Sequence, residues 1–422
     1  MRVFSRDTNA SRYDGAIATA TLVIFALVYV GMIIGEIPGL ALDRTGVALL
    51  GAIAVVAIGG QPIERAWSGV DVPTLLLLFA MMVVSAQFRL AGFYTHVSRQ
   101  LVALQVSPPR LLALVVGLAG LLSAVLTNDI VCLAMAPVLV EGCTRRKLDP
   151  LPFLLALACA ANVGSAATLI GNPQNILIGQ ALKLSFTGYL IDAGVPALLG
   201  LAATWAVIAF QYRGKWQRDM PQPTLHAPPF NRWQSGKGLT ITAALIVAFV
   251  FFPHLPREWV ALVCAGVLLL SRRMASREIM ALVDWQLLVL FIGLFVVNDA
   301  FQRTGAMDHA VAHLRSWGVD PGRPAALFGL SVLLSNLVSN VPATMLLLPS
   351  ATHPKAGAVL ALASTLAGNL MVVGSIANII VVMAARPLGV TIDFRTHLRT
   401  GVPVTIATLA IAAAWLALGL TR

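Results

Sequence analysis

A proline flanked by side-chain amides interrupts a long apolar segment of this 422-residue chain. The segment is residues 161–178, and the string Gly-Asn-Pro-Gln-Asn occupies its middle at residues 171–175. Proline has no backbone N–H and clashes with the preceding helical turn, so we expect a helix to break here. Inside a bilayer, freed backbone groups must bond to protein, water or a ligand. An amide-rich break at membrane depth is typical of transporter binding sites, and the alternative is a kink that neighbouring helices fill.

Composition identifies the class of protein. The chain is 58% hydrophobic and 11% charged, with a mean hydropathy of +0.84, whereas soluble globular proteins carry roughly 25% charged residues. This predicts an all-α polytopic membrane protein. The net charge of +11 comes from Lys and Arg outside the apolar runs. It indicates membrane topology and contact with anionic lipid rather than binding to nucleic acid.

An internal repeat predicts the architecture. Leu126-Thr127-Asn128 is echoed by Val338-Ser339-Asn340, and Gly171–Asn175 is echoed by Gly374–Asn378. The motifs keep their order and nearly their spacing, as expected for two copies of one unit. We predict two inverted-topology repeats of about five transmembrane helices each, every repeat with one re-entrant hairpin and one broken helix.

The predicted boundaries follow from the apolar runs and the polar segments between them. The first transmembrane repeat covers residues 1–212, a Pro-rich linker covers 213–237, and the second repeat covers 238–422. Predicted spans fall at about 16–35, 45–59, 72–88, 151–183 and 190–211, then at about 238–253, 258–271, 284–302, 356–385 and 401–420. The hairpins are predicted at about 110–143 and 324–349.

Length suggests that the first hairpin turns back inside the bilayer. Each of its arms has about 14 to 17 apolar residues and reaches about 21–25 Å, against a hydrocarbon core of about 30 Å. Two full spans are the alternative. Most of the 29 Lys and Arg residues fall on the side of the linker, so we predict a cytoplasmic linker. The basic N-terminal tail argues for the opposite orientation.

Four polar clusters carry the predicted chemistry. Thr127-Asn128 and Ser339-Asn340 are expected at hairpin tips, near the helix breaks of their own repeats. Hydroxyl and amide oxygens beside open carbonyls suit a small cation such as Na⁺, while N–H and O–H donors with helix N-terminal ends suit an anion. The alternative is that these residues bond helices to one another. The candidate substrate- or ion-binding residues are Thr127, Asn128, Asp129, Gly171, Asn172, Pro173, Asn175, Ser339, Asn340, Pro342, Gly374, Ser375 and Asn378.

Ionisable residues inside predicted membrane segments are costly and often functional, and two carboxylates there are candidates for such a role. Asp129 follows the first hairpin tip and has no acidic counterpart, since Val341 occupies the equivalent position. It is a candidate proton carrier, or it caps the helix that restarts after the tip. Asp299 is a second candidate, and its alternative role is an ion pair with Arg303 one turn later.

These motifs resemble the ion transporter superfamily, specifically bacterial anion permeases with a citrate-transporter-like domain. The strings that carry the resemblance are Leu126–Asp129, Thr168–Asn175 and Ser335–Pro342. The resemblance covers about residues 20–420 and includes arsenite permeases, divalent-anion symporters and some Na⁺/H⁺ antiporters. It implies a multi-pass protein of the bacterial inner membrane, a homodimer, and elevator-type movement of the hairpins and broken helices.

The resemblance also assigns roles to the motif residues. Thr127, Asn128, Gly171, Asn172 and Asn175 would bind one cation or part of the substrate, and Ser339, Asn340, Gly374, Ser375 and Asn378 would supply the matching half. Na⁺ would lie near Asn128, Gly171, Asn175, Asn340 and Asn378. Dicarboxylate carriers of the superfamily have Ser-Asn-Thr at both hairpin tips. Here the triplets are Thr-Asn-Asp and Ser-Asn-Val, which weakens a dicarboxylate assignment and the inference of two Na⁺ sites.

The sequence therefore predicts a secondary active transporter of a small inorganic or organic anion, coupled to H⁺ or Na⁺. It contains no hydrolase triad, Walker A loop, haem motif or zinc pattern, so we expect neither an enzyme nor a bound cofactor beyond the coupling ion. Two alternatives remain. One is a Na⁺/H⁺ antiporter that uses Asp129, and the other is a non-transporting membrane component with a permease fold.

Overall fold

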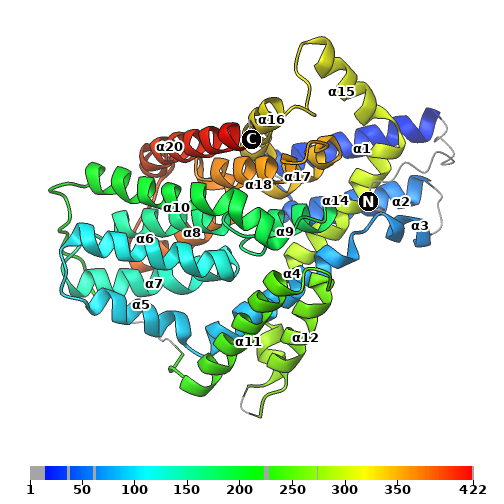
Figure 1. Ribbon diagram of the computed structural model, residues 1–422. Coiled ribbons are helices and arrows are strands. Elements are labelled where there is room, and N and C mark those ends of the chain that lie inside the picture. The colour runs from blue at the N-terminus through cyan, green and yellow to red at the C-terminus, as the bar shows by residue number, and fades with distance from the viewer. Residues whose placement is uncertain (1–14, 36–38, 60–62, 223–227, 273, 421–422) are drawn as a thin grey trace.

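The computed structural model describes residues 15–35, 39–59, 63–222, 228–272 and 274–420. Its architecture is helical throughout (Figure 1). Among these residues there is no β-strand, and an isolated bridge pairs Leu148 with Gln217. The N-terminal tail that bears on the predicted orientation, and residues 223–227 of the predicted linker, lie outside the described residues.

The first repeat contains ten α-helices. They are α1 (Gly15–Ile34), α2 (Arg44–Gly59), α3 (Ile63–Ser68), α4 (Val72–Leu90), α5 (Phe93–Ala103), α6 (Pro108–Val125), α7 (Asn128–Arg145), α8 (Pro150–Ser165), α9 (Pro173–Ala181) and α10 (Phe186–Gln211). The hairpin is α6 and α7, and the broken helix is α8 and α9.

The second repeat follows the same order. Its α-helices are α11 (Arg232–Phe251), α12 (Arg257–Leu269), α13 (Ser276–Met280), α14 (Trp285–Arg303), α15 (Ala306–Ser316), α16 (Pro324–Val338), α17 (Asn340–Leu347), α18 (Ala356–Ala367), α19 (Ile376–Ala385) and α20 (Phe394–Leu420). Short 3₁₀ turns cover Leu348–Ser350, Val372–Gly374 and Arg386–Leu388. The hairpin is α16 and α17, and the broken helix is α18 and α19. Because α11 begins at Arg232, it includes the last residues of the predicted linker.

Seven of the described helices are long and apolar enough to cross a membrane. They are α1, α4, α6, α10, α11, α14 and α20. The apolar helices of the broken segments are shorter, because each segment unwinds near its middle. The predicted fold class is confirmed: an all-α membrane protein built from two repeats, each with a hairpin and a broken helix.

The first hairpin is longer than predicted. Its arms α6 and α7 have 18 residues each, which corresponds to about 27 Å. Pro108 and Pro109 start α6 early, since proline is favoured in the first helical turn. The length of the arms therefore does not distinguish a re-entrant hairpin from two membrane-spanning helices, but the position of the hairpin tip does. The Asn128 N–H donates to the Gly171 carbonyl at 3.2 Å, in the break between α8 and α9, so the chain reverses direction inside the molecule.

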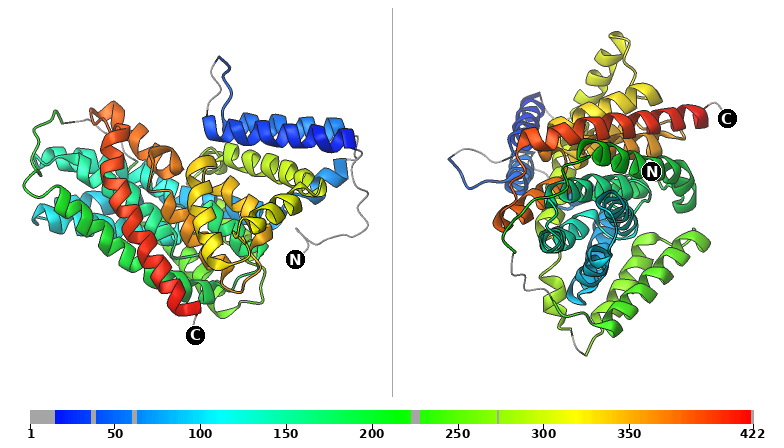
Figure 2. Two further views of the ribbon diagram at one scale, coloured as in Figure 1. Left: turned by 90° about the horizontal axis from the view of Figure 1, so that it is seen from above. Right: turned by 90° about the vertical axis from the view of Figure 1, so that its left-hand side faces the viewer.

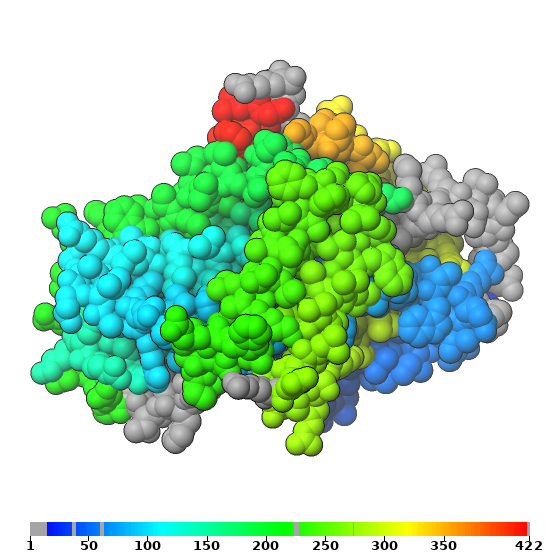
Figure 3. Space-filling model, turned by 60° about the horizontal axis from the view of Figure 1, so that its bottom comes forward, coloured from blue at the N-terminus to red at the C-terminus, as the bar shows by residue number. Residues whose placement is uncertain are grey.

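The helices pack in two groups. The hairpin group has α6 on α8, α16 and α17 on α18, α10 on α20, and α7 against both α8 and α19. Helix α9 belongs to it through contacts with α17 and α18, and it also contacts α4. The frame group has α2 between α1 and α14, and α4 against α11 and α12. Figure 1 shows α6, α7, α8 and α10 on one side of the molecule and α1, α2 and α3 on the other. Figure 2 shows α1 lying along α14, and in Figure 3 α11 and α12 form a ridge across the face shown.

Two glycines allow α6 and α8 of the hairpin group to pack closely. A Cβ on Gly164 of α8 would overlap the backbone of Gly120 in α6. Such small-residue contacts let helix backbones approach in membranes, where lipid offers no hydrophobic drive for association. The contact holds the first hairpin against the broken helix, and so it positions Asn128 relative to the break.

We predict that Gly164→Ala destabilises the protein by about 1–3 kcal/mol, because α6 and α8 must separate to admit the methyl group. Unfolding of the purified protein in detergent measures this. Gly117→Ala, also in α6, is the matched control, since nothing lies within 4 Å of a Cβ there. Equal stability of the two variants would show that the close contact is not important.

Candidate functional site

The break in the first repeat is held open by its own asparagines. Pro173 is the first residue of α9, and the Asn172 side chain caps the helix by accepting the Asn175 N–H at 2.9 Å. The Asn175 Nδ2 then donates to the carbonyls of Ser165 and Thr168 at 3.3 and 2.9 Å. Backbone oxygens that lose their helical partners at the break thus bond to a side chain of the same segment, as burial in a membrane requires.

In the second repeat too, an asparagine side chain donates to the open carbonyls of the break. The Asn378 Nδ2 donates to the carbonyls of Gly368 and Met371 at 2.8 and 3.1 Å. These carbonyls are the equivalents of the Ser165 and Thr168 carbonyls, because each pair precedes its asparagine by the same number of residues. The two breaks are therefore built alike, although Gln174 and Pro173 have no counterpart of their own kind in the second copy.

A third carbonyl is bonded in each break from a neighbouring helix. Tyr189 of α10 donates its hydroxyl to the Ala166 carbonyl at 2.8 Å and accepts from the Asn175 Nδ2 at 3.1 Å. At the equivalent place in the second repeat, His397 Nε2 of α20 lies 3.1 Å from the Asn369 carbonyl. No spacing pattern marks either residue, because Tyr189 and His397 lie near the starts of α10 and α20 among other polar residues.

The tip of the first hairpin meets the first break. The Asn128 N–H bonds to Gly171, as described above, and Thr127 bonds to Ser85 of α4 through its N–H and its hydroxyl, at 3.3 and 3.1 Å. Glycine is needed at position 171, since a Cβ there would overlap the carbonyl oxygens of Ser165 and Ser123.

The tip of the second hairpin approaches the second break in a comparable way. The Asn340 side-chain amide lies against the carbonyls of Ser364 and Gly374, and in the amide orientation that satisfies both its oxygen and its nitrogen, Nδ2 donates to them at 2.9 and 3.3 Å. Ser339 precedes it with φ of +75° and ψ of 162°, a strained conformation for a residue with a Cβ. The Pro342 carbonyl accepts from the Tyr29 hydroxyl of α1 at 3.4 Å.

Polar side chains also join the two repeats. Asn162 of α8, which is 1% exposed, donates to the Oδ1 atoms of Asn369 and Asn378 at 2.8 and 3.1 Å. In the opposite direction, the Thr365 hydroxyl of α18 donates to the Asn175 Oδ1 at 3.3 Å. Sequence reasoning missed Asn162, Thr365 and Asn369, although all three lie between residues of the predicted site.

Several buried oxygens near the tips and breaks have no hydrogen-bond partner among the described residues. They are the Asn128 Oδ1, the Ser123 and Ser335 hydroxyls and the Asn336 Oδ1. Unpartnered buried oxygens are unusual in proteins and call for an explanation such as an ion or water. The described residues contain no group of three or more His, Cys, Asp or Glu that could hold a metal.

Asp129 lies in the first turn of α7 and is partly buried. Among the described residues no backbone N–H donates to its carboxylate, so the capping interpretation is wrong. Its role as a proton carrier stays a prediction. Asp299, by contrast, pairs with Arg303 at 2.7 Å, which confirms the ion-pair interpretation for that residue.

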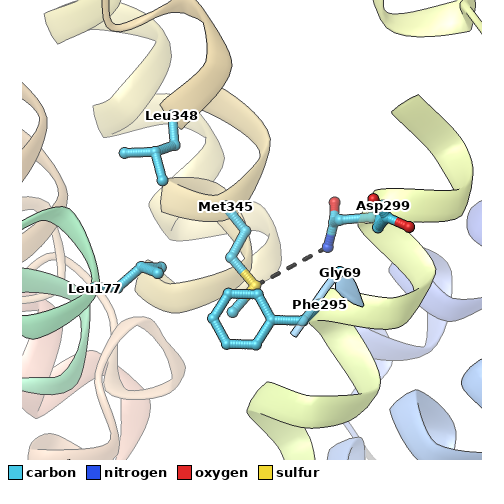
Figure 4. A pocket seen from close by; sticks show the side chains of 7 residues that line it. Gly69, Leu177, Phe295, Asp299, Met345 and Leu348 are labelled. Carbon is cyan, nitrogen blue, oxygen red and sulfur yellow. Dashed lines mark hydrogen bonds between the residues drawn. The ribbon is translucent and has the colours of Figure 1, made fainter. Parts of the chain in front are cut away.

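Asp299 borders a small cavity between the frame and hairpin groups, shown in Figure 4. Asn298 also lines it and approaches the Met345 sulfur of α17 at 4.0 Å. The rest of the lining is mostly apolar, with Leu177 of α9 and Phe295 of α14. The cavity is about 10 Å³, which is at the lower limit for one water molecule, and its lining includes none of the candidate site residues at the tips and breaks.

Comparison with known proteins identifies the family. Residues 28–367 match the family described as "Citrate transporter". The chain belongs to this citrate transporter family. The resemblance inferred from the sequence motifs is thereby confirmed, and the protein is a multi-pass membrane transporter of this family.

Relatives match nearly the whole chain. The "46 kDa membrane protein" of Mycobacterium leprae is 28% identical over 401 residues, covering 89% of this chain and 93% of the relative. "Silicon efflux transporter LSI3" of Oryza sativa subsp. japonica is 28% identical over 465 residues, covering 92% and 95%. "Putative transporter arsB" of Dictyostelium discoideum is 23% identical over 533 residues, covering 97% and 93%.

A solved structure has the same fold. The YdaH transporter of Alcanivorax borkumensis superposes with a TM-score of 0.60 at 15% sequence identity, covering 96% of this chain and 98% of that one. At this identity the match shows a shared fold, and the chemistry of the site rests on the residues above.

We predict that Asn175→Ala and Asn378→Ala each lower the free energy of unfolding by roughly 1–3 kcal/mol, because each leaves two buried carbonyls without a donor. Unfolding in detergent compares them with Gln302→Ala, a partly exposed amide of α14 that serves as control. If the three variants are equally stable, the asparagines do not hold the breaks open.

Proposed function

We propose that this transporter is a secondary active carrier of a small inorganic or organic anion, coupled to H⁺ or Na⁺. The supporting observation is the meeting of four elements: two hairpin tips and two helix breaks, joined by buried amides and hydroxyls. Each tip contacts the break of its own repeat, and Asn162 and Thr365 join the repeats. In secondary transporters, inverted repeats with broken helices form the substrate and ion sites in this way.

Cation binding is supported by the unpartnered oxygens. The Asn128 Oδ1 and the Ser123 hydroxyl belong to the first hairpin, and the Ser335 hydroxyl and the Asn336 Oδ1 belong to the second. An amide or hydroxyl oxygen buried without a donor is destabilising, and a bound Na⁺ would remove this cost. One group of oxygens in each repeat gives two candidate positions, although the hairpin triplets differ between the repeats.

Anion binding is supported by the helix ends. Helices α7, α9, α17 and α19 all begin at tips or breaks. The first N–H groups of a helix have no acceptor within that helix, which gives each of these ends a partial positive charge. Asn172 and Ser375 stand at the caps of α9 and α19. A small anion held by such donors beside a bound cation would be stabilised by both, and this mutual stabilisation would couple the two fluxes.

Elevator movement is supported by the two packing groups. The hairpin group contains every element of the candidate site except Ser85 and Tyr29, which lie on α4 and α1 of the frame group. If the hairpin group slides along the frame group, the site reaches the two membrane surfaces in turn. A homodimer in the bacterial inner membrane, with the linker in the cytoplasm, would hold the frame in place.

A specific observation favours one rival function. Because Asp129 neither caps α7 nor forms a described ion pair, a Na⁺/H⁺ antiporter could use it to bind Na⁺ and H⁺ in alternation. This rival predicts exchange of the two cations and no anion flux. If the protein is instead a non-transporting membrane component, we expect its function to be unchanged when the site asparagines are substituted.

Uptake by the purified protein in liposomes tests the proposal, with Na⁺ and pH gradients imposed separately. Arsenite, phosphate, sulfate and citrate are the probes, and orthosilicic acid joins them because one relative is named a silicon efflux transporter. We expect gradient-driven flux of at least one probe. Cation exchange without flux of any probe would favour the antiporter.

In the same assay, Asn128→Ala combined with Asn340→Ala should reduce flux by about tenfold or more, because each change removes ligands or positioning bonds. Thr204→Val is the control, since its hydroxyl bonds within α10. Full activity of the double variant would support the non-transporting interpretation instead.

We predict that Asp129→Asn removes the pH dependence of transport if protons couple through this carboxylate, because the amide cannot titrate. Initial rates across a pH series, compared with the parent protein, measure the effect. An unchanged pH profile would exclude Asp129 as the proton carrier.

A further inference from the structure

One buried side chain contacts three separate parts of the candidate site. Asn162 lies on α8, one turn before the first break begins. Its Oδ1 accepts from the Asn128 Nδ2 at 3.2 Å and from the Ser375 hydroxyl at 2.9 Å. Its Nδ2 donates to Asn369 and Asn378, as described above. The first hairpin tip, the end of α18 and the start of α19 are therefore all bonded to one amide.

The bonding capacity of this amide is fully used. An asparagine side chain has two N–H donors and two acceptor lone pairs, and the four contacts of Asn162 use all of them. The side chain could bind an ion only by giving up one of these bonds. Its arrangement fits a residue that orients other ligands better than a residue that is itself a ligand.

Asn162 determines which atom of Asn128 is available. Because the Asn128 Nδ2 donates to Asn162, the Asn128 Oδ1 points elsewhere, and it is one of the buried oxygens without a partner. Asn128 is only 4% exposed, so water on the protein surface does not satisfy that oxygen. Because of the bond to Asn162, the Asn128 Oδ1 remains available as an acceptor in the buried candidate site.

The equivalent residue in the other repeat has a narrower set of contacts. Thr365 precedes Asn378 by the same number of residues as Asn162 precedes Asn175. Its hydroxyl bonds to the first break, at Asn172, Gln174 and Asn175. No described bond joins it to a hairpin tip. Each repeat therefore reaches across to the break of the other, but among the described residues only the Asn162 side chain links a tip to the opposite break.

From this asymmetry we infer that Asn162 is a positioning residue that orients the Asn128 Oδ1 and couples the first hairpin tip to the break of the second repeat by hydrogen bonds, in addition to the packing of α7 on α19. The inference builds on the proposed transport function and names how its two half-sites communicate. When a ligand binds at Asn128 and shifts its side chain, the hydrogen bonds of Asn162 transmit this shift to Ser375 and Asn378. Thr365 holds the first break independently of this link.

Hydrogen–deuterium exchange of the full-length protein tests the inference without any ligand. In Asn162→Thr, which places the residue type of position 365 at this site, amides of residues 122–131 and 368–379 should exchange about tenfold faster or more, because buried bonds are lost. Amides of residues 168–176 should not change. In Thr365→Val the pattern should reverse, with faster exchange at 168–176 alone.

Two further variants keep the test decisive. Cys159→Ala, one turn earlier on α8, should leave all three segments unchanged, since the side chain of this buried cysteine forms no described bond. If Asn162→Thr fails to fold, Ser375→Ala cuts one of the same links and should speed exchange at 368–379 and 122–131 but not at 168–176.

Equal acceleration of all three segments in both variants, or acceleration confined to α8, would overturn the inference, because either result would show general loosening rather than a specific link. The outcome is separate from that of the transport assay. If the exchange pattern holds while liposomes show no flux, the proposed function fails and the positioning role stands.

Discussion

Every part of this structure depends on the bonding of backbone groups where the membrane helices unwind. A broken helix inside a bilayer leaves carbonyls and N–H groups that lipid cannot satisfy. Here Asn175 and Asn378 supply donors to the open carbonyls, and Tyr189 and His397 add one contact each from neighbouring helices. Because these side chains bond the open carbonyls, the breaks are stable, and α9 and α19 begin inside the protein. A site for small ions requires helix ends at such a position.

The sequence predicted the parts of this arrangement that have a local signal. Pro173 and the small residues around it marked the first break, and the echo at Gly374 marked the second, because unwinding depends on residues that disfavour a helix. The family also followed from these strings. The expectation that tip and break of each repeat meet is seen in the contacts of Asn128 with Gly171 and of Asn340 with Gly374.

The residues that sequence reasoning missed have a common cause. Asn162 and Thr365 each sit in a helix of strongly apolar character, where one polar residue is compatible with ordinary packing. Their importance comes from contacts between repeats that are distant along the chain, and no spacing rule within one helix reveals such contacts. The arms of the first hairpin were predicted too short because Pro108, at the start of α6, belongs to the helix. The capping interpretation of Asp129 is wrong because no described backbone N–H of α7 donates to its carboxylate.

The two repeats are alike at their helix breaks and differ at their hairpin tips, and both findings bear on the proposed transport mechanism. The two breaks are alike in backbone bonding, as alternating access to two membrane surfaces would favour. The hairpin tips differ: the first carries Asp129 and bonds to α4 through Thr127, while the second contains the strained Ser339 and bonds to α1 through Pro342. We interpret the symmetric part as the machinery of movement and the asymmetric part as the source of ion and substrate preference.

A cryo-electron microscopy map of the protein in nanodiscs, recorded with and without a transported ion, is the most direct test. Ligand density next to the Asn128 Oδ1, between the first hairpin tip and the two breaks, is the result that the account predicts. Density in the cavity beside Asn298 and Met345 instead, with the tips and breaks unchanged by the ion, would contradict it.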